Sequence, residues 1–246
     1  MISELTFAKK FTSFWNQLLP NEKHYVRLIN EGLFEVFDAP TGQRNRKENI
    51  AFINELAFEL YKSIVQKEIK IFDIDNNGFY KENIFNIIYE NARSRLAKFA
   101  YGSNFSLPLN PNEFHTMKQL VVRLHTRYFQ NLVDITASPF FSGCGYINNS
   151  FGDLYIPGKL IEVKSGARNF GVVDFRQVLI YCTLNFYSKK CVKIDNIELV
   201  NPRMGITYSS KIDDLSNNLG SLDPEDLFFE IKQHITENSF IEGAIS

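Results

Sequence analysis

Residues 151 to 164 constrain the fold more than any other part of the sequence, because two alternating apolar and polar runs flank the dipeptide Pro157-Gly158. A Pro-Gly pair between such runs is typical of a tight turn and predicts a β-hairpin. A loop of two residues also sets the register of that hairpin. The predicted pairs are Ile156 with Lys159, Tyr155 with Leu160 and Leu154 with Ile161. Continuing the register places Asp153 directly opposite Glu162.

Two carboxylates at opposed positions of a hairpin are destabilising unless a positive group neutralises them, because the Cβ atoms are only about 4.5–5.5 Å apart. Lys164 lies two residues beyond Glu162 and therefore on the same face of the strand. The other face is predicted to be buried and consists of Leu154, Ile156, Ile161 and Val163. One interpretation is a divalent cation held by Asp153 and Glu162. The alternative is a surface charge cluster in which Lys164 only screens its acidic neighbours.

The first interpretation suits phosphodiester hydrolysis. A hard cation held by carboxylates polarises a phosphate and lowers the pKa of a bound water, and a fixed ammonium orients the water or offsets developing negative charge. The predicted helix from Asp174 to about Tyr187 adds Gln177 and Tyr181, one turn apart on one face. Alternatively, Asp174 and Gln177 form an N-terminal capping box and Tyr181 is half-buried aromatic surface.

Taken together, Gly152-Asp153, Glu162-Val163-Lys164 and Gln177-x-x-x-Tyr181 resemble the PD-(D/E)XK phosphodiesterase superfamily of restriction-endonuclease-like nucleases, including its branch with a glutamine-tyrosine helix motif. The resemblance covers roughly residues 115 to 208. It implies a core of one helix, three strands, a second helix and a fourth strand. The implied activity is that of a Mg²⁺-dependent DNA endonuclease, for which Mn²⁺ would substitute.

By the same resemblance, every motif residue has an expected role. The metal ligands would be Asp153, Glu162 and the carbonyl of Val163; Lys164 would be the catalytic lysine, and Gln177 and Tyr181 would position the substrate backbone or the metal shell.

The sequence departs from the family pattern in two places. Gly152 replaces the proline that normally precedes the first aspartate, at a position that does no chemistry. Many members also supply an acid from the preceding helix, whereas here only Glu113 precedes that helix and Asp134 follows it. His125 is a candidate substitute, although a single histidine on a helix is more often structural. Arg203, in the turn after the last core strand, is a candidate phosphate contact.

The expected fold class is α+β, with an α-helical N-terminal region because apolar residues recur at helical spacing there. A turn-forming run at residues 106–111 is the expected domain boundary. The expected units are an α-helical N-terminal domain (1–111) that binds substrate or a partner, a restriction-endonuclease-like core (112–210), and an acidic, helical C-terminal segment (211–246). Within the core, helices are expected at about 115–132 and 174–187, and β-type runs at 145–147, 151–156, 160–164 and 197–200.

The formal net charge of −1 is unevenly distributed. From Lys211 onward 8 acidic residues face 2 basic ones, which leaves 25 basic and 20 acidic residues before that point, a net charge of +5. This surplus is compatible with a polyanionic partner. Arg44, Arg46, Lys47, Arg93, Arg95 and Lys98 are basic residues of a kind that is usually only solvated, and on a nuclease they would be contacts to the phosphate backbone.

The three cysteines, Cys144, Cys182 and Cys191, are far apart and form no CxxC pair, so neither a disulfide framework nor a zinc knuckle is expected. No apolar run approaches the roughly 18 residues of a membrane span, and we expect a cytoplasmic protein without a membrane partner. DNA is the expected partner of a nuclease in bacterial defence or repair. The alternatives are a subunit that needs a helicase or ATPase, a homo-oligomer, and a catalytically silent nuclease-like interaction domain.

Overall fold

Six strands form one mixed sheet in the order β1-β8-β7-β6-β5-β2, and two more pair as a separate ribbon, within the residues that the structure describes. The structure is a computed structural model that describes residues 1–99, 105–131 and 134–237. The strands are β1 (Glu35–Val36), β2 (Thr136–Ala137), β3 (Phe140–Phe141), β4 (Ser150–Phe151), β5 (Leu154–Ile156), β6 (Gly158–Val163), β7 (Ile194–Asn201) and β8 (Ile206–Lys211). The expected α+β class is confirmed.

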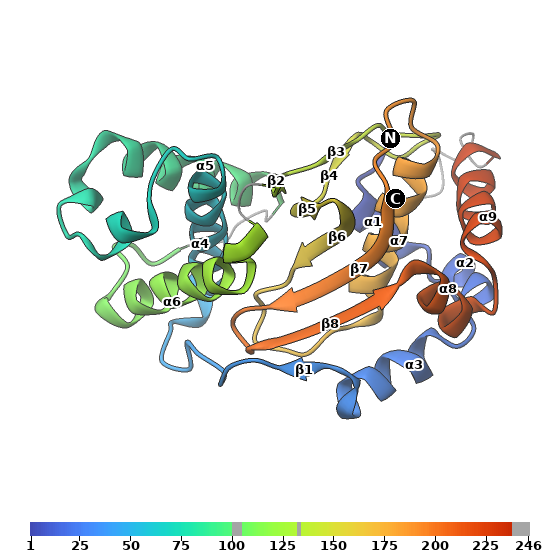
Figure 1. Ribbon diagram of the computed structural model, residues 1–246, viewed down its shortest axis with the longest axis horizontal. Coiled ribbons are helices and arrows are strands. Elements are labelled where there is room, and N and C mark those ends of the chain that lie inside the picture. Colours follow the sequence, from blue (N-terminus) through green and yellow to red (C-terminus); the bar gives the residue numbers. More distant parts are fainter. Residues whose placement is uncertain (100–104, 132–133, 238–246) are drawn as a thin grey trace.

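Helices cover both faces of this sheet (Figure 1). The α-helices are α1 (Glu4–Lys10), α2 (Thr12–Leu18), α3 (Glu22–Leu28), α4 (Ile50–Val65), α5 (Asn83–Phe99), α6 (Pro111–Tyr128), α7 (Val172–Phe186), α8 (Ile212–Gly220) and α9 (Pro224–Glu237). Among them, no helix of the described residues is both long and apolar enough to cross a membrane.

The predicted hairpin is present with the predicted register. β5 and β6 are antiparallel, and the three residue pairs derived from a two-residue loop are all observed. Gly158 has a φ of +84°, which glycine adopts without steric cost. The pairing ends at Leu154, so the preceding Asp153 lies in a bend at the open end of the hairpin rather than in a strand.

The strand β6 lies between β5 and β7 and is paired along both edges. It runs parallel to β7, and α7 makes the crossover between them. The backbone N–H of Lys164 donates to the carbonyl of Val200 at 2.7 Å, which extends the pairing one residue beyond β6. Asn201 then holds the loop before α7, since its side-chain amide donates to the carbonyls of Gly166 and Arg168, both at 2.9 Å.

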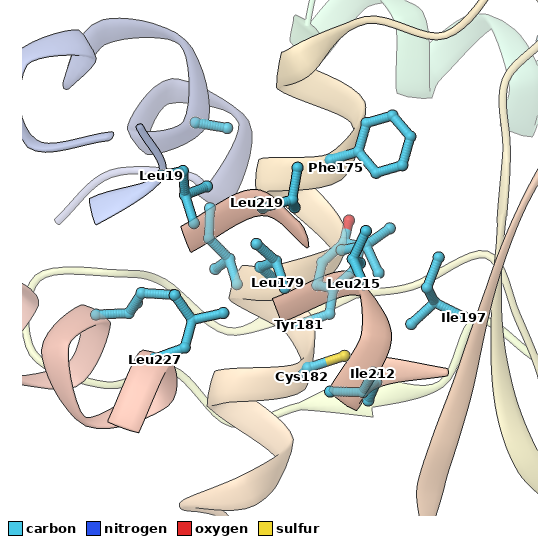
Figure 2. Packing of buried hydrophobic residues seen from close by; sticks show 14 of the residues in the cluster. Leu19, Phe175, Leu179, Tyr181, Cys182, Ile197, Ile212, Leu215, Leu219 and Leu227 are labelled. Atoms are coloured by element: carbon cyan, nitrogen blue, oxygen red, sulfur yellow. The ribbon is translucent and has the colours of Figure 1, made fainter. Parts of the chain in front are cut away.

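Alternation along β6 divides the apolar core between the two faces of the sheet. Leu160 belongs to a cluster with α1, α7, α8 and α9, and Ile161 belongs to a cluster with α4, α5 and α6. Figure 2 shows the first cluster, in which residues of α7 meet residues of α8 and β7. Because α7 is enclosed by these neighbours, its polar residues Gln177 and Tyr181 are buried as well.

Helices on both sides of the expected boundary at residue 111 share these clusters. α4 and α5 pack with α6 over one face of the sheet, while α1 packs on α7 over the other. β1 also pairs antiparallel with β8 and thereby joins the edge of the sheet. The α8 and α9 helices occupy the expected acidic segment as far as Glu237, and residues 238–246 lie outside the described residues.

Two expected strands differ in the structure. Residues 145–147 are not a strand: they form a turn, and Ile147 makes only an isolated bridge to Ile2. The run at 151–156 is divided between β4 and β5 by the bend at Gly152-Asp153. The third antiparallel strand beside β5 is instead β2, whose two residues are too few to show a period in the sequence. The expected helix at 115–132 is α6, which begins at Pro111 and ends at Tyr128.

Candidate active site

The end of the β5–β6 hairpin brings Asp153, Glu162 and Lys164 together. An Oδ2 atom of Asp153 accepts a hydrogen bond of 2.8 Å from the backbone N–H of Val163, which ties the bend to the end of β6. Glu162 and Lys164 point to the same face of β6, and the Lys164 ammonium donates to Glu162 Oε1 at 2.8 Å. The acids and the lysine are therefore brought together, but Asp153 reaches the end of β6 from the bend through Val163 and does not pair with Glu162 across the hairpin as predicted.

The helix α7 adds Gln177 to this group. Its Oε1 accepts a hydrogen bond of 2.7 Å from the Lys164 ammonium, which is thus held between Glu162 and Gln177. Asp174 lies 3.9 Å from the same ammonium. Asp174 also accepts from the backbone N–H of Gly171 at 2.8 Å, which makes Gly171 the N-cap of α7 and Asp174 its third residue, so the alternative capping box between Asp174 and Gln177 is wrong. The cap is made with Gly171 and leaves Gln177 free to bind Lys164.

Tyr181 completes the chain of contacts and links it to the N-terminal segment. Its hydroxyl accepts from Gln177 Nε2 at 2.8 Å and donates to Glu4 Oε1 at 3.3 Å. Gln177 Nε2 lies 3.4 Å from the same oxygen of Glu4. Tyr181 is only 2% exposed and its ring stacks on Phe141, with centroids 5.4 Å apart. Tyr181 is therefore a buried member of the site and not aromatic surface.

Burial dominates the electrostatics of the two acids. Glu162 is 3% exposed; burial, and after it the charge of Asp153, raise its pKa to about 8 despite the opposing effect of Lys164. Burial likewise raises the pKa of Asp153, against the effect of Lys164. For Lys164 burial alone would lower the pKa, but Glu162 and the other nearby acids outweigh it and raise that pKa. Simultaneous ionisation of Asp153 and Glu162 is therefore unfavourable.

One atom of the site has no hydrogen-bond partner. Oε2 of Glu162 is buried and accepts no hydrogen bond from any described residue. A buried carboxylate oxygen in this state carries an uncompensated desolvation cost. Together with Asp153 it is an oxygen donor of the kind that hard divalent cations prefer. The residues present therefore fit the metal that the motif implies.

The number of acidic ligands is nevertheless small. Within the described parts of the chain, no group of three or more His, Cys, Asp or Glu side chains is arranged to hold a metal ion. A site at this position would consist of Asp153, Glu162 and a main-chain oxygen such as that of Val163. Water would fill the remaining positions, as is usual for Mg²⁺.

None of the three upstream candidates is placed at this site by a contact. Glu113 is buried and caps α6 while it binds Arg46 through both carboxylate oxygens. The ring of His125 packs against Phe129, with centroids 5.2 Å apart. Asp134 is exposed beyond the end of α6. These residues have structural roles or face solvent.

Two acids that sequence reasoning missed are near the site. Glu4 on α1 contacts Gln177 and Tyr181, as described above. Glu55 on α4 is close enough to Asp153 to raise its pKa, and it pairs with Arg95 at 3.0 Å. Both come from segments about 100 or more residues before the hairpin, and no local pattern connects them to it. Only a search for acids on buried helix faces would have singled them out.

The basic residues also differ from expectation. Arg203 is 1% exposed and donates to Asn54 and to the carbonyl of Ser165, so it anchors the loop after Lys164 rather than offering a phosphate contact. Burial lowers the pKa of Arg203 to about 10. Arg46 and Arg95 are engaged in ion pairs with buried acids. The side chain of Lys98 lies outside the described residues.

An open cleft lies elsewhere among the residues that the structure describes. A cleft of about 640 Å³ runs between α6 and the turn of the hairpin and is lined by Arg127, Lys159 and Glu198 at the opposite end of β6. Its cations are already paired, since Arg127 and Lys159 both bind Glu198. The site itself reaches solvent through Lys164, whose side chain is 18% exposed, and through the half-buried Asp153. The site therefore lies at the carboxyl end of β6, at the opposite end of the hairpin from this cleft.

Comparisons with protein-family models, with curated proteins and with solved structures find no match for this chain.

Proposed function

We propose that this protein is a metal-dependent nuclease of the PD-(D/E)XK type that hydrolyses phosphodiester bonds of DNA with Mg²⁺. The observation that carries the proposal is the buried Oε2 atom of Glu162, which lies beside Asp153 and Lys164 and has no hydrogen-bond partner among the residues that the structure describes. In a surface charge cluster, water would hydrate the carboxylate oxygens and none would be left buried without a partner. Here Glu162 is buried and Asp153 half-buried, and a cation is a partner that both carboxylates could bind.

The residues of the chain have distinct tasks in this reaction. Asp153, Glu162 and the carbonyl of Val163 would hold the cation, which when bound supplies charge neutralisation for the phosphate and acidifies a water. The Lys164 ammonium, held between Glu162 and Gln177, offers its remaining proton to the water or to the phosphate oxygen on which charge develops. Preorganisation of that ammonium avoids reorientation during the reaction.

The test is cleavage of supercoiled plasmid and of linear DNA, with RNA in parallel, by purified protein in Mg²⁺ or Mn²⁺. Wild-type protein should nick or cut DNA, and chelation of the metal should stop it. Glu162→Ala and Lys164→Ala should each abolish cleavage. Matched controls are Glu230→Gln on α9 and Lys189→Ala, since both positions are exposed and should leave the rate unchanged.

Cleavage that survives Glu162→Ala or Lys164→Ala would refute this assignment. Binding of Mn²⁺ should be measured alongside by calorimetry. A wild-type protein that binds Mn²⁺ through Glu162 but cuts nothing would instead support a nuclease subunit that acts with a helicase or ATPase. A protein that neither binds Mn²⁺ nor cuts would support a silent interaction domain.

A further inference from the structure

Glu4, the first residue of α1, contacts both members of the Gln177–Tyr181 pair, with its Oε1 atom 3.4 Å from Gln177 Nε2 and 3.3 Å from the Tyr181 hydroxyl. Its position is tightly held. On one side of it, Ile2 exchanges backbone hydrogen bonds with Tyr146 and Asn148, at 2.8 and 2.9 Å. On the other side, the carbonyl of Ala8 accepts from Arg176 of α7 at 3.1 Å. The placement of Glu4 against α7 is therefore a built feature of the fold.

The contacts of Glu4 restrict how Gln177 can be oriented. A carboxylate only accepts hydrogen bonds and an ammonium only donates them. Gln177 lies between the two, so its Nε2 has to face Glu4 and its Oε1 has to face Lys164. If the amide were turned over, it would place two donors together at Lys164 and two acceptors together at Glu4.

The hydroxyl of Tyr181 reinforces this restriction. Because it donates its proton to Glu4, its lone pair is left to accept from Gln177 Nε2. Without the Glu4 carboxylate, the hydroxyl is free to donate to Gln177 Oε1 instead. That donation would compete with Lys164 for the same oxygen.

We propose, on the basis of the proposed nuclease function, that Glu4 is a positioning residue: its carboxylate fixes the amide of Gln177, which in turn holds the Lys164 ammonium against Glu162. Glu4 touches neither Lys164 nor Glu162 through any described contact, so it acts through Gln177 and Tyr181. Residue 4 and residue 164 are thus connected by a chain of hydrogen bonds across the interface of α1 and α7.

The test combines Glu4→Ala with Gln177→Ala in a double-mutant cycle of single-turnover DNA cleavage in Mg²⁺. Glu4→Ala should slow cleavage about tenfold, the order expected when one hydrogen bond to a charged group is lost. Glu4→Gln keeps an acceptor at the same length and should stay within about threefold of wild type. In the Gln177→Ala background, Glu4→Ala should have no further effect, because the two residues act in series.

Ser3→Ala is the control for an effect that arises only from a loss of α1 stability. Ser3 is the N-cap of α1, and its Oγ accepts from the backbone of Thr6 at 3.1 Å. This variant should lower Tm as much as Glu4→Ala does while leaving the cleavage rate unchanged. The proposal is overturned if Glu4→Ala cuts at the wild-type rate, or if it slows the Gln177→Ala protein as much as it slows wild type.

A second measurement does not depend on cleavage. Reductive methylation with formaldehyde and cyanoborohydride, followed by mass spectrometry, gives the labelling rate of Lys164. That rate should rise severalfold in Glu4→Ala and in Gln177→Ala, because the ammonium is released. An unchanged rate overturns the positioning role. A raised rate in a protein that cuts no nucleic acid would support the positioning role and count against the nuclease.

Discussion

Glu162→Gln should make the metal-free protein more stable while abolishing its proposed activity. The pKa of Glu162 is raised by burial, and next by the charge of Asp153, from 4.5 to about 8. A carboxyl with a higher pKa in the folded state binds more protons when folded than when unfolded. The free energy of unfolding therefore falls as pH rises between about 4.5 and 8. Glutamine at this position resembles the neutral acid and escapes that loss.

The size of the effect follows from the same two pKa values. Between the unfolded-state pKa of 4.5 and pH 7, the wild-type protein loses about 1.36 kcal/mol of unfolding free energy per pH unit, over about 2.5 units. Glu162→Gln avoids this loss and should therefore be more stable than wild type at pH 7 by roughly 3 kcal/mol. At pH 5 the same linkage amounts to less than about 1 kcal/mol. Solvent screening does not reduce this figure, because Glu162 is 3% exposed. The difference between the two proteins should therefore widen with pH.

Urea unfolding at pH 5, 6, 7 and 8, in chelator and then in Mg²⁺, measures this directly. Mg²⁺ at 100 times its Kd should add about 2.7 kcal/mol to wild type and nothing to Glu162→Gln. Glu230→Gln, at an exposed position of α9, controls for loss of a carboxyl elsewhere. A Glu162→Gln protein that is less stable than wild type at pH 8 in chelator would refute the reasoning, because the buried acid would then be stabilising.

Three further outcomes are expected. Lys164→Ala should abolish plasmid cleavage but keep the Mg²⁺-dependent rise in Tm, since an ammonium is not a metal ligand. Glu113→Gln should lose roughly 3 kcal/mol of unfolding free energy at pH 7: burial alone would raise the pKa of Glu113, but hydrogen bonds from Arg46 and two asparagines lower it to about 2. This loss should vanish as pH falls from 4.5 toward 2 in urea titrations, and a loss independent of pH would contradict it. Gly205→Ala should lower the free energy of unfolding by more than about 1 kcal/mol, because φ is +66° and an added Cβ would lie 2.1 Å from the carbonyl oxygen of Asp38. Urea unfolding measures this change, and an unchanged midpoint would count against this packing.

The local part of the site was predictable because hairpin geometry depends on few variables. A two-residue loop and strict alternation set the register of β5 and β6, and the observed pairs are the predicted ones. The spacing of Gln177 and Tyr181 on a helix likewise placed both on one face. The spacing alone does not say which part of the protein this face of the helix meets. The 2.7 Å contact of Gln177 with Lys164 exists because the crossover places α7 beside the end of β6.

The remainder depends on contacts between distant segments. The pairing of β1 with β8 joins residues about 170 positions apart and involves only two residues of β1, which is too short for a period. Glu4 and Glu55 reach the site from helices whose sequences indicate only an apolar face. Arg203 looked like a phosphate contact because it follows a strand, yet the loop it anchors buries it. Such placements are decided by packing.

The position of β6 explains why Asp153 and Glu162 cannot move apart to reduce the repulsion between their charges. A strand at the edge of a sheet can bulge or twist to separate two like charges. β6 is paired with β5 on one side and with β7 on the other, and Val163 binds the Asp153 carboxylate through its backbone. Glu162 is thus held beside Asp153 by main-chain hydrogen bonds. The remaining ways to lower the energy are a proton on Glu162, the ammonium of Lys164, or a cation at the unpartnered oxygen. The first two act in the metal-free protein, and a cation at Oε2 would displace the proton while Lys164 stays held by Glu162 Oε1 and Gln177.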